Sequence, residues 1–218
     1  MRSYCAAAGA AGAGLLALAT PAAAQIVYTP VHESLMNESY LLVDLNHDGV
    51  TDIVLTNEVN PNTSVLSQSV FATGALHPQN AVITSHTDLA LALPRGARIG
   101  SSQPFFIVGF MADRWRSVLG GHGSGGNWDD VKNRYLGIRF TINGGTHYGW
   151  ARLDVEVKWN SILAVLTGYA YNTVAGQGVL AGQTSNTDAS VEAPPLEPAT
   201  LGRLALGWTG LESWRSGR

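Results

Sequence analysis

The residues with the clearest potential chemistry lie in one acidic stretch, DLNHDGVTD, at positions 44–52. Four of its side chains carry an oxygen that could bind a cation: Asp44, Asn46, Asp48 and Asp52. The carbonyl of Val50 falls at the seventh position, and Gly49 at the sixth permits a sharp turn. Calcium takes about six to eight oxygen ligands, and alternate positions of a tightly curled loop can converge on one ion. The spacing therefore predicts a structural calcium (Ca2+) site.

The alternative for this stretch is a plain turn. Asp and Asn side chains also accept hydrogen bonds from their own backbone in tight turns, without any cation. Four oxygen donors this close together repel one another when no cation is present, which favours calcium. Apolar-rich runs at 38–44 and 50–56 flank the stretch and predict two strands, so the loop would lock a hairpin rather than catalyse. His47 is expected to face solvent, since calcium prefers oxygen ligands.

Two aromatic residues, Tyr148 and Trp150, form the second candidate site. Extending the alternation of the downstream strand backwards places both rings on the face of Arg152 and Asp154. Two exposed amphipathic rings at this spacing would make a ligand platform, for example for sugar rings. The alternatives are that a neighbouring loop covers the rings, or that Gly149 introduces a bulge and reverses the alternation.

A glycine-rich stretch at 120–130, GGHGSGGNWDD, is interpreted as a mobile surface loop. It lacks the residue order of a phosphate-binding loop. A hydrolytic pair of His122 or His147 with Asp129 or Asp130 is the alternative. The sequence contains no nucleophile elbow and no H-E-x-x-H zinc motif. It therefore predicts no catalytic residue and no enzyme.

The elements that must position these residues are strands. Apolar residues alternate over 136–142 and again over 151–159, and Asn143 and two glycines between them favour a hairpin turn. A third apolar run at 162–171 completes a predicted three-stranded meander. Shorter runs at 80–84 and 105–110 add further strands, and no segment has a helical period. About seven to ten short strands predict an all-β fold, a single antiparallel, jelly-roll-like β-sandwich.

The first 24 residues are typical of an export signal. Arg2 precedes an apolar run, which ends in an A-x-A site before Gln25. The remaining 194 residues hold 12 basic and 16 acidic side chains, a balance of −4 that disfavours nucleic acid as a partner. Cys5, the only cysteine, lies within the signal. We expect a β-sandwich domain at 25–183, a linker at 184–195 and a tail at 196–218.

Two parts of the chain resemble known families. The chain resembles exported bacterial proteins of the PEP-CTERM class in two regions. These are residues 135–183, with the stretches YLGIRF, THYGWARLDVEV and LTGYAYNTVAGQGVLAGQ, and the tail EPATLGRLALGWTGLESWRSGR. The pattern D-x-N-x-D-G-x-x-D resembles the calcium loops of dockerin-like, thrombospondin-type and FG-GAP repeats. Leu55 stands where an EF-hand requires glutamate. The PEP-CTERM likeness implies export, processing of the tail by a sorting protease, and a link to bacteria that make exopolysaccharide.

The tail departs from the PEP-CTERM pattern. Its apolar run covers 201–211, is interrupted by Arg203, and at 1.5 Å per residue reaches about half of a bilayer core. A stable membrane span is therefore not expected. The sequence predicts a secreted or cell-envelope-associated, non-enzymatic protein with a structural calcium site in an exopolysaccharide or biofilm matrix. The alternative is a module that binds or cleaves extracellular polysaccharide.

Overall fold

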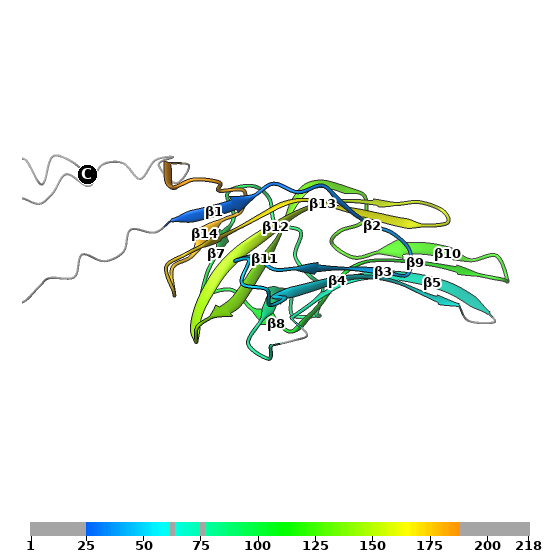
Figure 1. The fold of residues 1–218 in the computed structure, drawn as a ribbon. Coiled ribbons are helices and arrows are strands. Elements are labelled where there is room, and N and C mark those ends of the chain that lie inside the picture. Colours follow the sequence, from blue (N-terminus) through cyan, green and yellow to red (C-terminus); the bar gives the residue numbers. More distant parts are fainter. Residues whose placement is uncertain (1–24, 62–63, 75–76, 188–218) are drawn as a thin grey trace, which may run out of the picture.

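The computed structural model describes residues 25–61, 64–74 and 77–187 (Figure 1). The expected signal at 1–24, most of the expected linker and the tail at 196–218 lie outside these residues. The described part of the chain contains strands and turns but no helix, so the all-β prediction is confirmed. It also holds no helix of the length and apolarity that a membrane span requires.

The largest sheet has seven strands, and every pairing in it is antiparallel. Its strands are β1 (Ile26–Thr29), β2 (Glu33–Leu35), β6 (Ala81–Ile83), β8 (Phe105–Phe106), β11 (Val131–Ile142), β12 (Gly145–Val157) and β13 (Ile162–Asn172). The strand order is β1-β13-β12-β11-β6-β8, and β2 also pairs with β13.

Two further sheets complete the described fold. A five-stranded sheet, in the order β10-β9-β5-β4-β3, is built from β3 (Ser39–Val43), β4 (Ile53–Pro61), β5 (Val65–Thr73), β9 (Val108–Ser117) and β10 (His122–Gly125). A two-stranded sheet pairs β7 (Arg98–Ile99) with β14 (Val179–Leu180). The structure therefore has three sheets, where the sequence suggested a single two-sheet sandwich.

The predicted meander is confirmed as β11, β12 and β13. Ile142 pairs with Gly145, which leaves a two-residue turn between β11 and β12. Asn143 and Gly144 occupy this turn with φ of 49° and 80°. Positive φ at both turn residues matches the right-handed twist of the flanking strands, which explains why the hairpin forms here. One expectation was wrong: Trp159 lies in the turn after β12 and is 60% exposed rather than on the apolar face.

The main core lies between the seven-stranded and the five-stranded sheet, which form two layers in Figure 1. Leu136, Ile138 and Phe140 of β11 are fully buried there, as their alternation predicts. They share the core with residues of the five-stranded sheet such as Ile53 and Leu55. Burying alternate side chains of both sheets is the main source of stability in such a fold.

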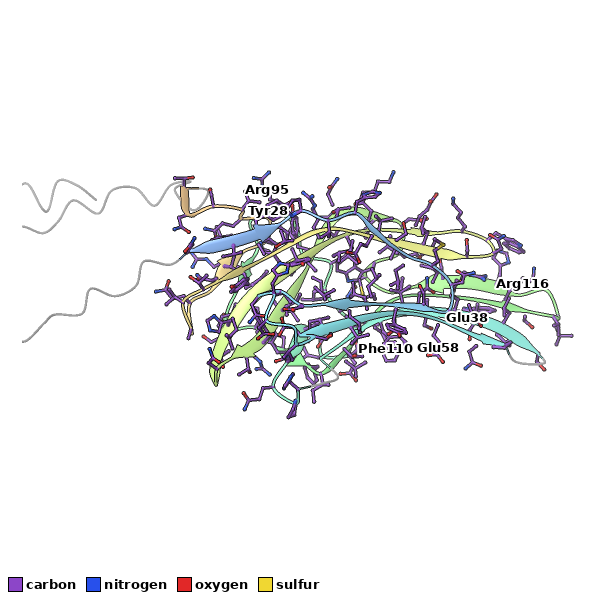
Figure 2. All side chains as sticks on the ribbon, in the orientation of Figure 1. Tyr28, Glu38, Glu58, Arg95, Phe110 and Arg116 are labelled. Carbon is purple, nitrogen blue, oxygen red and sulfur yellow. The ribbon has the colours of Figure 1, made fainter. Side chains whose placement is uncertain are left out.

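A second, smaller core lies on the other face of the seven-stranded sheet. The two-stranded sheet covers this face and buries Ile99 and Val179 against Tyr135 and Trp150. The outer face of the five-stranded sheet is in contrast open to solvent, and Phe110 projects from it with 49% of its surface exposed (Figure 2).

A buried polar network joins the two large sheets at the end farthest from β1. Arg114 of β9 is 5% exposed, and its Nε donates to Gln68 Oε1 at 3.0 Å. Its two terminal nitrogens donate to the carbonyls of Trp159 and Asn160 at 2.9 and 2.7 Å. Burial lowers the pKa of Arg114, and nearby Arg116 adds to this effect. The guanidinium thereby ties the β12–β13 turn to the five-stranded sheet.

Candidate functional site

The acidic stretch forms the connection between β3 and β4, as its flanking apolar runs predict. Val43 and Ile53 are the last paired residues, and the Asp52 N–H donates to the Val43 carbonyl at 2.9 Å. His47 and Gly49 take positive φ of 60° and 86°, so the chain curls tightly between the two strands. His47 faces solvent as expected.

Two carboxylates of the loop accept hydrogen bonds from its own backbone. Asp44 Oδ2 accepts from the Gly49 N–H at 2.8 Å, and Asp48 Oδ1 accepts from the Val50 N–H at 2.8 Å. These are bonds that a plain turn also makes. A carboxylate has about four lone-pair positions, so each retains acceptor capacity for a cation.

Asn46 is the residue that a plain turn does not explain. Its Nδ2 donates to Asp48 Oδ2 at 2.8 Å. Only the nitrogen of an amide can donate to a carboxylate, so the orientation of the amide is determined and Oδ1 points the other way. Asn46 Oδ1 is buried and has no hydrogen-bond partner in the described structure. A buried acceptor without a partner costs about 1–3 kcal/mol, which a bound cation would remove.

Asp52 closes the loop on its inner side. The carboxylate is 4% exposed, and its Oδ2 accepts from the Leu45 N–H at 2.8 Å. Burial raises the pKa of Asp52 to about 7; the Leu45 N–H opposes the rise, and the charges of Asp44 and Asp48 add to it. Hydrogen bonds from Asn46 and the Val50 N–H lower the pKa of Asp48. The loop thus places a buried carboxyl beside two others, and this arrangement favours either a proton or a cation.

The loop meets part of the requirement for calcium. In the part of the chain that the structure describes, no three His, Cys, Asp or Glu side chains converge closely enough to hold a metal ion on their own. The expected donors are nevertheless all oxygens, the ligand type that calcium prefers. The unpartnered Asn46 Oδ1 and the carboxylates of Asp44, Asp48 and Asp52 are therefore of the chemical type that binds calcium, and the Val50 carbonyl is a further oxygen of that type.

The expected aromatic platform is wrong, because both rings are buried. Tyr148 is 5% exposed and Trp150 is fully buried. Their predicted face is correct, since Ala151 belongs to the main core and the two rings belong to the second core. The Trp150 ring meets Tyr135 edge-on at 5.1 Å between centroids, and its Nε1 donates to the Gln183 carbonyl at 3.2 Å. The surface that was expected to bind a ligand instead packs beneath the two-stranded sheet.

The hydrolytic His–Asp pairs are likewise not formed among the described residues. His122 packs edge-on against Trp159 at 4.5 Å, and His147 Nδ1 lies 2.9 Å from the Asn172 carbonyl. Asp129 accepts from Ser124 Oγ, and Asp130 accepts from the Val157 N–H, both at 2.7 Å. Asp129 thus makes a local contact, and Asp130 joins the start of β11 to the end of β12; neither is bonded to a histidine in these interactions.

The glycine-rich stretch around these residues is partly ordered into β10. Trp128, within this stretch, is fully buried and donates from Nε1 to the Ala90 carbonyl at 3.1 Å. A buried, hydrogen-bonded tryptophan anchors the stretch to the core, so the interpretation as a mobile surface loop is wrong here.

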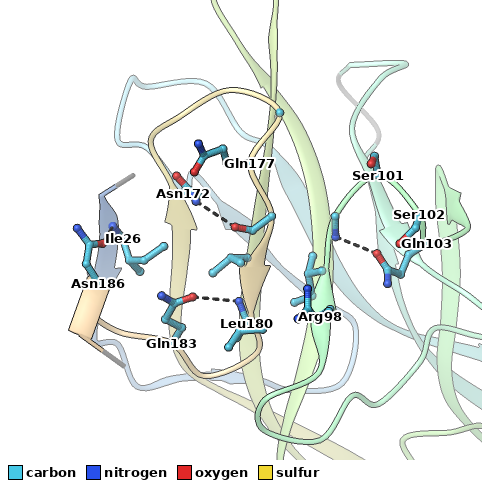
Figure 3. A pocket seen from close by; sticks show the side chains of 15 residues that line it. Ile26, Arg98, Ser101, Ser102, Gln103, Asn172, Gln177, Leu180, Gln183 and Asn186 are labelled. Atoms are coloured by element: carbon cyan, nitrogen blue, oxygen red, sulfur yellow. Dashed lines mark hydrogen bonds between the residues drawn. The ribbon is translucent and has the colours of Figure 1, made fainter. Parts of the chain in front are cut away.

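One concave site was missed in the sequence. A pocket of about 550 Å³ lies over β7, β14 and the end of β13 (Figure 3). Its lining comes from four separate segments around Ile26, at 98–103, at 172–180 and at 183–186. No local motif joins these segments; the pairing of β7 with β14 and of β1 with β13 brings them together, with a hydrogen bond from the Ile26 N–H to Asn186.

Comparison with known protein families, curated proteins and solved structures finds no match to this chain.

Proposed function

We propose that this chain is an exported, non-enzymatic protein of the cell envelope or its surrounding matrix, stabilised by one structural calcium ion. The ion would bind in the β3–β4 loop, with side-chain oxygens from Asp44, Asn46, Asp48 and Asp52 and the Val50 carbonyl. The single observation that carries this proposal is the buried Asn46 Oδ1 without a hydrogen-bond partner, in a loop that also carries Asp44, Asp48 and Asp52. A loop that served only as a turn would gain nothing from that arrangement.

Calcium in this loop would act on the fold rather than on a substrate. The loop joins two neighbouring strands whose inward side chains, including Ile53 and Leu55, belong to the main core. An ion that binds only the native state stabilises it by RT ln(1 + [L]/Kd), which is roughly 2.7 kcal/mol when free calcium exceeds Kd about 100-fold. Extracellular calcium modules have Kd values on the order of 10⁻⁴–10⁻³ M, which suits an exported protein.

The remaining features of the proposal come from the sequence. Residues 1–24 would be removed during export, and the tail at 196–218 would be the substrate of a sorting protease at the envelope. The finer fold assignment belongs to the same proposal: the domain at 25–183 would be one jelly-roll-like sandwich, with β7 and β14 as an addition on its outer face. Extracellular polysaccharide is the proposed surrounding material.

The test is thermal unfolding during a calcium titration of three proteins: wild type, Asp48→Ala and Asp113→Ala. Asp113 is an exposed residue of β9 and controls for loss of one negative charge outside the loop. We expect the Tm of the wild type and of Asp113→Ala to rise with calcium and to fall when a chelator is added. Asp48→Ala should fold but lose this response. Identical titration curves for wild type and Asp48→Ala would show that the loop is only a turn.

A further inference from the structure

The pocket over β7 and β14 has rigid walls, because amide side chains fasten its loops. Gln103 Oε1 accepts from the Gly100 N–H at 2.9 Å, and Gln183 Oε1 accepts from the Leu180 N–H at 3.1 Å (Figure 3). Asn172, which is 3% exposed, accepts from the Val174 N–H and donates to the Gly178 carbonyl, both at 3.0 Å. Asn186 Oδ1 accepts from the Ile26 N–H at 3.0 Å. The walls are therefore held in place without a ligand.

These bonds also determine the polarity that the pocket presents to a ligand. A backbone N–H can only donate, so each of the four amides must turn its oxygen toward the protein. The amide nitrogens of Gln103 and Asn186 are left to donate elsewhere. Each of the four amide oxygens is thus engaged in an internal hydrogen bond, while two amide nitrogens remain to donate to a ligand.

One positive charge reinforces this surplus of donors. Arg98 lines the pocket from β7, is exposed, and has no hydrogen bond or ion pair from its guanidinium within the described part of the chain. No aspartate or glutamate is among the described residues that line the pocket, although the chain as a whole is acidic. The guanidinium fork matches a carboxylate in geometry and charge.

Hydroxyl and amide groups stand around Arg98 on two sides. Ser101 and Ser102 lie on one wall, and Gln177 lies on the opposite one (Figure 3). The apolar residues Ile99 and Val179 also line the pocket. A ligand that meets these hydroxyl and amide groups as well as Arg98 needs oxygens besides those of its carboxylate, carried on a ring or chain. A volume of about 550 Å³ accommodates such a small molecule.

We propose that this pocket binds a carboxylate that also bears several hydroxyl groups, the chemistry of a uronic acid, with its carboxylate on Arg98. The ligand would be a free sugar acid or one unit of an acidic polysaccharide. The origin of this ligand in the matrix rests on the proposed function. The pocket itself does not include the calcium loop, so ligand binding and calcium binding can be tested separately.

The experiment is calorimetric titration of the full chain with sodium galacturonate. Galactose, which differs only by a hydroxymethyl group in place of the carboxylate, is the neutral probe, and acetate is the bare carboxylate. Arg98→Gln is the test variant. Arg95→Gln is the matched control, because Arg95 is an exposed arginine close to Arg98 in the sequence that does not line the pocket.

We expect galacturonate to bind wild type and Arg95→Gln equally, and more tightly than galactose or acetate. Arg98→Gln should bind it roughly 10- to 100-fold more weakly, the loss typical of one hydrogen-bonded charge. A trimer of galacturonate that binds more tightly than the monomer would identify the polymer as the source; equal affinity would identify the free acid. The proposal would be overturned if acetate or galactose bound as tightly as galacturonate, or if galacturonate did not bind. It would also be overturned if Arg98→Gln and Arg95→Gln lost affinity for galacturonate equally. The change of Tm with calcium is measured in the same samples. A chain that responds to calcium but does not bind galacturonate would contradict the pocket proposal alone, not the proposed function.

Discussion

Replacing Asp52 by asparagine tests the charge of the acidic loop directly. Burial raises the pKa of Asp52 from its usual 3.8 to about 7. The folded protein therefore retains a proton on this carboxyl at pH values where the unfolded chain has lost it. For a carboxyl with a raised pKa, native stability falls as the pH rises from about 4 to about 7 and remains low above that range. Asparagine keeps an oxygen to accept the Leu45 N–H but carries no charge at any pH.

The size of the effect follows from the displacement of the pKa. About three pH units correspond to about 4 kcal/mol of stability that the metal-free wild type loses across this window. A protein of this size changes its Tm by about 2–4 °C for each kcal/mol, so the loss is on the order of 10 °C. A calcium ion beside the ionised carboxylate would reverse much of this loss, because it replaces the proton as the neutralising charge.

The assay is thermal unfolding of wild type and Asp52→Asn between about pH 4 and about pH 8, with chelator and with calcium. The difference between the two proteins isolates Asp52 from the other titrating groups. In chelator, we expect the Tm of Asp52→Asn to exceed that of wild type by a margin that grows with pH. Calcium should raise the Tm of wild type most at the upper end of the range and have little effect on the variant. Parallel pH curves in chelator would refute the burial argument, and an equal calcium response would remove Asp52 from the ligand set.

Two further predictions concern the fold and export. Arg114→Met should lower the unfolding free energy by roughly 3 kcal/mol, because the carbonyls of Trp159 and Asn160 lose their donors. Denaturant unfolding measures this loss, with the exposed Arg116→Met as the control. Equal losses in both variants would contradict a special role for Arg114. Mass spectrometry of protein from its native host should find an N-terminus at or near Gln25, and an intact 1–24 segment on the exported protein would contradict the assigned signal.

Local patterns in the sequence were sufficient for some of the hairpins, but not for β4 with β5 or for β9 with β10. The meander of β11, β12 and β13 and the β3–β4 hairpin were predicted because alternation and turn residues lie within a few positions of each other. The strand predicted at 105–110 is divided between β8 and β9, which belong to different sheets, and β5 was not predicted. The chain passes from one sheet to the other between β8 and β9, a change that no local period reports. The miss at β5 has another cause, because β5 forms a hairpin with β4 in the same sheet.

Alternation shows which side chains share a face of a strand, but it cannot show what covers that face. Alternation alone is enough to place Tyr148 and Trp150 on the face opposite Ala151, and the order of residues alone gives the spacing of oxygens in the acidic loop. The folded chain is needed to see that β7 and β14, from distant parts of the sequence, bury the two rings and form the pocket that Arg98 lines. It is also needed to see that Asp52 is buried, and hence that its pKa is raised. The physical reason is that exposure, and the desolvation that follows from it, depends on contacts between segments far apart in sequence.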